Sequence, residues 1–132
     1  MIATANPHLL KKFLPAIAWL IVVTILHCIP GKDIPKIGWL QQINFDKLVH
    51  LGIFALLVFI WCYSFFRAGK TGERPKKTFM LIAAAALIYG IGMELVQHYF
   101  ISNRSMDIFD IAFDSAGILT GLLFSERKFL KK

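Results

Sequence analysis

Carboxylates stand at helical spacing in parts of this sequence where apolar residues dominate. Asp107, Asp110 and Asp114 are three and four residues apart, so a helix would place all three on one face. Glu94 ends a long apolar run, and Gln97 follows it by three residues. An ionisable group inside an apolar helix is costly, so it faces a protein interior or a wet cavity. We therefore expect these side chains to form a polar site.

A second polar stripe opens another apolar segment. Asp46 and His50 are four residues apart and share a helix face, with Lys47 beside them. Histidine and carboxylates act as general acids and bases, or ligate a divalent metal, whereas lysine and arginine bind phosphate or carboxylate. The residue types allow each of these chemistries and identify no particular metal or cofactor.

Four apolar stretches must position these groups: residues 13–29, 48–66, 78–99 and 108–124. Each is close to the roughly 20 residues that a helix needs to cross a bilayer core of about 30 Å. Hydrophobic residues make up 57% of the 132-residue chain, more than a water-soluble domain uses. Because backbone groups in lipid must be hydrogen-bonded internally, we expect an all-α integral membrane bundle of four transmembrane helices, forming one domain over residues 1–132.

The basic residues predict the orientation of this bundle. Most of the 15 lysines and arginines precede the first span, fill the loop between the second and third, or follow the fourth. The positive-inside rule places both termini and that loop in the cytoplasm. Since orientation accounts for the net charge of +7 and no nucleic-acid motif accompanies it, we do not expect nucleic-acid binding. Of the eight acids, only Glu73 and Glu126 fall on the cytoplasmic side.

The deepest carboxylates are expected to lie level with each other. Glu94 is seven residues before Ile101 and Asp114 seven after Asp107, which puts each about 10 Å inward at 1.5 Å per residue. The loop between these two helices is short, so they are antiparallel neighbours. Together with the second polar stripe they would enclose a pocket open to the outside. The candidate pocket residues are Asp46, Lys47, His50, Glu94, Gln97, Arg104, Asp107, Asp110 and Asp114.

Other residues are expected to have structural roles. Thr78 and Ser105 are predicted to cap the third and fourth spans, since hydroxyl side chains bond free N–H groups at helix starts. Gly117 and Gly121 form a small-residue step typical of close helix packing. His27, at the outer end of the first span, is interpreted as an interfacial histidine.

The segments "FDKLVHLGIF" and "YGIGMELVQHYFISNRSMDIFDIAFDSAGILTG", with the four-span layout, resemble the VanZ-like membrane proteins. The family pattern is D-K-x-x-H, then E-x-x-Q, R-S-x-D-x-x-D and N-x-x-G, and Asp114 stands where the family usually has Asn. The resemblance implies a bacterial inner or plasma membrane protein linked to teicoplanin-type glycopeptide resistance. The matching positions are Asp46, Lys47, His50, Glu94, Gln97, Arg104, Ser105, Asp107, Asp110 and Gly117.

Four functions remain open on these residues. The pocket could bind an envelope lipid or a lipid-linked cell-wall precursor, the interpretation we favour. It could belong to a membrane-embedded enzyme with His50 or Glu94 as general base, or with carboxylates as metal ligands. It could be a structural network in which Glu94 or Asp110 bonds Arg104 and Lys47. An ion- or proton-coupled carrier is disfavoured, because the inner halves of the spans contain almost no polar residues.

Overall fold

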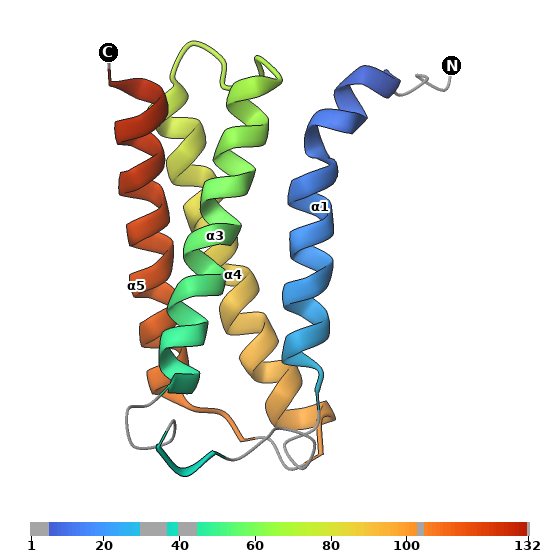
Figure 1. Cartoon of the computed structure of the whole chain (residues 1–132), viewed down its shortest axis with the longest axis vertical. Helices are drawn as coiled ribbons and strands as arrows, with labels where there is room; N and C mark the ends of the chain where they lie inside the picture. Colours follow the sequence, from blue (N-terminus) through green and yellow to red (C-terminus); the bar gives the residue numbers. More distant parts are fainter. Residues whose placement is uncertain (1–5, 30–36, 40–44, 103–104, 132) are drawn as a thin grey trace.

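The computed structural model describes residues 6–29, 37–39, 45–102 and 105–131. Within these residues four long helices run antiparallel to their neighbours in sequence and no strand occurs, which confirms the predicted all-α bundle (Figure 1). Both ends of the chain and the loop after α3 lie at one end of the bundle (Figure 1). The helices are α1 (Pro7–His27), α3 (Phe45–Arg67), α4 (Pro75–Phe100) and α5 (Ile108–Ser125), which a π-helical turn, η2 (Glu126–Leu130), continues.

Each helix is long and apolar enough to cross a membrane, with α5 and η2 counted as one. The helices extend beyond most of the predicted limits of 13–29, 48–66, 78–99 and 108–124, mainly because polar residues add turns at their ends. Such turns are tolerated at the ends of a span, where water can satisfy the free backbone groups.

The two predicted caps are wrong. α4 starts at Pro75, three residues before Thr78, since proline has no N–H to satisfy and its fixed φ suits a first helical position. α5 is capped by Asp107, whose carboxylate accepts a hydrogen bond of 2.8 Å from a first-turn N–H, and Ser105 lies outside the helix. Asp107 therefore both starts α5 and belongs to its polar stripe.

The predicted close packing at Gly117 and Gly121 is confirmed. A Cβ atom on Gly117 would collide with the backbone carbonyl of Leu51, and one on Gly121 would lie 2.5 Å from the carbonyl oxygen of Ala55. The backbones of α3 and α5 therefore touch without intervening side chains. This approach also brings the polar stripes of the two helices together.

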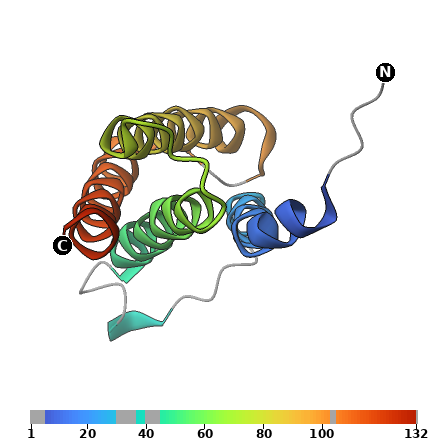
Figure 2. The same cartoon turned by 90° about the horizontal axis from the view of Figure 1, so that it is seen from above.

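The fourth wall of the bundle is α1, which packs beside α3 (Figure 2). The Trp19 indole donates to the backbone carbonyl of Ile53 on α3 at 3.1 Å. On the α4 side, the hydroxyls of Thr24 and Tyr89 are 2.6 Å apart. These polar contacts fix the rotation of α1, and its last residue, His27, is then turned into the bundle, where it is 2% exposed.

Replacing Gly117 by alanine is expected to lower the free energy of unfolding by about 1–3 kcal/mol, because the new methyl group must push α3 and α5 apart. The measurement is the thermal unfolding midpoint in a mild detergent. Gly92→Ala on α4 is the matched control, since nothing lies within 4 Å of its added Cβ. Equal midpoints for the two variants would contradict the packing argument.

Candidate functional site

Lys47 on α3 is surrounded by carboxylates. Its ammonium donates to Asp107 Oδ2 at 2.6 Å and to Asp110 Oδ1 at 2.5 Å, and lies 3.4 Å from Asp46 Oδ2. The side chain of Lys47 is 13% exposed, whereas those of Asp107 and Asp46 are 38% and 66% exposed. This group of four residues therefore closes the site at the end of the bundle, and the lysine charge is balanced by acids of the protein itself.

The charge state of Asp107 follows from the same contact. Hydrogen bonds from the Lys47 ammonium and the Phe109 N–H lower the pKa of Asp107 below its ordinary value. Asp107 is therefore ionised at neutral pH. The interaction stabilises the fold above the ordinary pKa of 3.8 and is lost as the pH falls through the lower pKa of the folded protein.

A second group lies deeper and draws one residue from each long helix. We name His27 (α1), His50 (α3), Glu94 (α4) and Asp114 (α5) the acid–histidine cluster. One nitrogen or oxygen atom of each lies within 4.8 Å of the corresponding atoms of the others. Glu94 and Asp114 are both buried, 0% and 1% exposed. One oxygen of each lies within 4.8 Å of the other, which confirms the prediction that the two deep carboxylates are level.

His50 connects the group around Lys47 with the acid–histidine cluster. Its Nδ1 lies 2.8 Å from Asp114 Oδ1, and its Nε2 lies 3.8 Å from Asp110 Oδ2. Lys47 and His50, one helical turn apart on α3, thus alternate with the three aspartates of α5. The pairing follows from the spacing of the two stripes once the glycines bring the helices into contact.

Three carboxylate oxygens of the cluster are poorly satisfied. Among the described residues, neither carboxylate oxygen of Glu94 accepts a hydrogen bond of good geometry, and the same is true of Asp114 Oδ2. A buried carboxylate without donors or a nearby cation is strongly disfavoured. The cluster therefore needs protons, water or a bound cation to be stable.

His27 was missed by the sequence interpretation, which placed it at the membrane interface. Its Nδ1 lies 2.8 Å from the carbonyl of Val23, and its ring centroid is 5.4 Å from that of His50. Its backbone carbonyl accepts a hydrogen bond of 3.0 Å from the Gln97 amide, which is the role the structure gives to that predicted site residue. The one available signal was that His27 falls at the same end of its span as the other polar groups.

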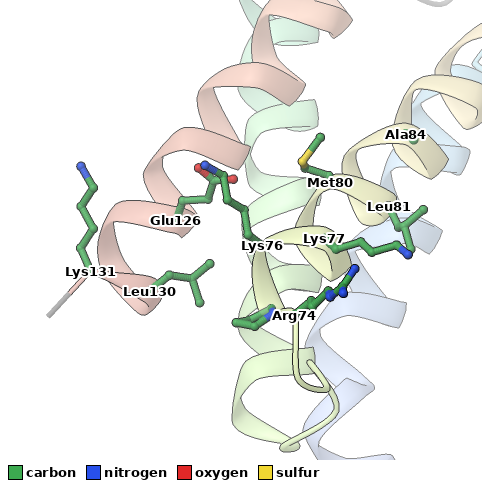
Figure 3. A pocket seen from close by; sticks show the side chains of 10 residues that line it. Arg74, Lys76, Lys77, Met80, Leu81, Ala84, Glu126, Leu130 and Lys131 are labelled. Atoms are coloured by element: carbon green, nitrogen blue, oxygen red, sulfur yellow. The ribbon is translucent and has the colours of Figure 1, made fainter.

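The structure thus brings the predicted candidates to one end of the bundle, apart from Arg104, which lies outside the described residues. This end is opposite the two ends of the chain (Figure 1). The polar side chains pack against one another there. A groove of about 900 Å³ opens at the other end instead, between the start of α4 and η2, where Arg74, Lys76, Lys77 and Lys131 line it together with apolar side chains (Figure 3).

The chemistry open to the cluster is that of two imidazoles and two carboxylates. An imidazole oriented by a carboxylate, as His50 is by Asp114, is suited to move a proton. Imidazole nitrogens with carboxylate oxygens are also ligands that zinc and related divalent metals accept. No thiol belongs to the cluster, since the described cysteines, Cys28 and Cys62, lie outside it.

The fold and the site define a multi-pass membrane protein with a buried polar centre at one end of its helices. The family model VanZ/LLP1 matches residues 8–129, nearly the whole chain, and the protein belongs to this family. Neither the curated proteins nor the solved structures gave a match.

Replacing Lys47 by methionine is expected to destabilise the protein by about 1–3 kcal/mol, since it leaves neighbouring carboxylates without their cation. The loss should be smaller than the about 3–5 kcal/mol of a fully buried pair, because the acids are partly exposed. The thermal unfolding midpoint in detergent at neutral pH measures it. Lys77→Met, at an exposed position on α4, is the control. A Lys47→Met midpoint no lower than the control's would refute this role.

Proposed function

We propose that the protein spans the inner or plasma membrane of a bacterium and that its polar end, outside the cell, binds the headgroup of an envelope lipid or a lipid-linked cell-wall precursor. The orientation is supported by the basic residues, which gather where both chain ends and the loop after α3 lie (Figure 1). The acid–histidine cluster then faces the compartment in which those headgroups are displayed.

The observation that carries the proposal is the column of carboxylates that leads inward from the outer end of the bundle. It starts at the exposed side chains of Asp46 and Asp107, passes Asp110, and ends at the buried Glu94 and Asp114. Carboxylates accept hydrogen bonds from hydroxyl and amine groups. Sugar and amine groups of a headgroup are therefore the partners that this column fits.

The structure changes the expected role of Lys47. From the sequence, Lys47 at the mouth of the site could hold a phosphate or a carboxylate of a ligand, but its ammonium is already within 3.4 Å of three carboxylates of the protein. A phosphate would have to compete with these acids at close range. We therefore assign recognition to the carboxylates and not to this lysine.

The link to glycopeptide resistance follows from the ligand. Those antibiotics act by binding lipid-linked cell-wall precursors, so a protein that holds or alters such a lipid would lower the amount of antibiotic that the cell surface captures. A membrane-embedded enzyme acting on the same lipid is the second candidate. It is favoured by the 2.8 Å contact between His50 and Asp114, which would orient His50 as a general base.

Glu94→Gln is expected to abolish the protection that expression of the protein gives a bacterium against teicoplanin. The change keeps the size of the side chain and removes its charge. The measurement is the minimal inhibitory concentration at equal membrane abundance, with Glu73→Gln, in the exposed loop at the opposite end, as control. Full protection by Glu94→Gln would overturn the proposal that this site carries the function.

The orientation predicts which cysteines a membrane-impermeant maleimide labels in intact cells. In a variant in which both native cysteines, Cys28 and Cys62, are replaced by serine, Ser105→Cys should react at once. Glu73→Cys should react only after the membrane is permeabilised. Both positions are exposed, so a difference reports the side of the membrane. The reverse pattern would place the polar end in the cytoplasm.

A further inference from the structure

We propose that His27, His50, Glu94 and Asp114 are the four protein ligands of one divalent transition-metal ion of the zinc class. The site goes beyond the lipid-binding function proposed above and does not depend on it. A bound ion would occupy Glu94 and Asp114 and leave Asp46, Asp107 and Asp110 as the carboxylates of the column that can reach a headgroup. Three independent features of the cluster support it: the ligand types, the charge of the buried groups and the contacts that orient the ligands.

The ligand set is the first feature. Two imidazoles and two carboxylates match the nitrogen and oxygen donors of zinc sites. Around a tetrahedral ion with bonds of about 2.0–2.1 Å, neighbouring ligand atoms are about 3.4 Å apart. The atoms of the cluster lie within 4.8 Å of one another, so side-chain rotations that move them inward by about 1 Å complete the shell.

Charge is the second feature. Glu94 and Asp114 bring two carboxylates into a place where they are 0% and 1% exposed, inside a ring of apolar helices. The described lysine closest along the polar stripe, Lys47, is already paired with Asp107 and Asp110. A divalent ion would balance both buried carboxylates at once. It would also give a partner to the oxygens of Glu94 and to Asp114 Oδ2, which accept no hydrogen bond of good geometry among the described residues.

Orientation of the ligands is the third feature. A metal-bound histidine usually donates its other ring N–H to a carbonyl or a carboxylate, which selects the tautomer. His27 Nδ1 is 2.8 Å from the Val23 carbonyl, so Nε2 is its ligating atom. His50 Nδ1 is 2.8 Å from Asp114 Oδ1, so this nitrogen and the Asp114 carboxylate already lie side by side as ligands of one ion would. His50 Nε2, 3.8 Å from Asp110 Oδ2, is then the ring N–H that Asp110 orients. The Gln97 amide holds the carbonyl of His27 and thereby the end of α1.

The packing around the cluster supports this geometry. A Cβ on Gly90 would lie 3.1 Å from the Phe54 ring and 3.3 Å from Asp114 Oδ2, so the glycine leaves room for both. The Phe54 ring in turn lies 5.8 Å from the His27 ring, centroid to centroid. An apolar floor of this kind restricts water on the inner side of a metal and strengthens its bonds to charged ligands.

The test uses the full-length protein in mild detergent, stripped of metal with a chelator and titrated with Co²⁺ as a spectroscopic probe. Wild type should take up one Co²⁺ per chain, with the visible absorption of a four- or five-coordinate ion, and Zn²⁺ should displace it. Glu94→Gln and His27→Gln should each weaken Co²⁺ binding by about tenfold or more. Removing a residue that only hydrogen-bonds a ligand already lowers metal affinity about 10–100-fold, and these variants remove a ligand itself.

Two exposed positions provide the controls. His98→Gln, on the same helix as Glu94, and Glu73→Gln each remove one exposed potential ligand and should bind Co²⁺ as wild type does. The proposal is overturned if wild type gives no saturable spectrum, or if the spectrum survives in Glu94→Gln and His27→Gln.

A second measurement on wild type covers the case in which a variant fails to fold. The X-ray absorption spectrum of the zinc-loaded protein should show two imidazole ligands together with oxygen, and a shell of oxygen alone would refute the site. Both readouts report metal binding and not antibiotic susceptibility. Failure of the metal site and failure of the lipid-binding function can therefore be told apart.

Discussion

The contact between α3 and α5 decides where the polar groups of this protein lie. Two glycines on α5 let its backbone touch that of α3, and at this separation Lys47 and His50 reach the aspartates of the facing helix. A larger residue at either glycine would hold the stripes apart and leave charged side chains in an apolar bundle. Packing and electrostatics are thus coupled, since one geometry satisfies both.

α1 and α4 bring their own titratable residues to the same place as this pair. Glu94 on α4 and His27 on α1 lie at the level of Asp114 on α5 and His50 on α3. The apolar core below, which includes Phe54, Leu57 and Val58, is continuous with the floor of the cluster. Each of the four helices is therefore rotated so that it places a titratable residue inside the bundle at one common level.

Much of this arrangement was predictable because a helix has a fixed rise and period. Spacing alone gave the faces of α3 and α5, and a rise of 1.5 Å per residue gave the common level of Glu94 and Asp114. The place of His27 was not predictable in this way, since it is the only titratable residue in the last half of α1 and has no periodic partner. Its inward direction results from the contacts of Trp19 and Thr24 with other helices. The start of α4 was misjudged because the first turn of a helix accepts polar residues and proline, so the apolar run begins later than the helix does.

Each of the four cluster residues comes from a different helix, and this has a consequence for biosynthesis. Helices enter the membrane in the order in which the ribosome makes them, so α4 is in place with Glu94 before α5 supplies Asp114. Until then, the carboxylate of Glu94 has at most two of its three final neighbours from the chain, and the polar face of α3 lacks the aspartates of α5. Insertion of α5 is thus the event that assembles the centre, and an incomplete chain would expose charged groups that quality-control proteases in the membrane can recognise.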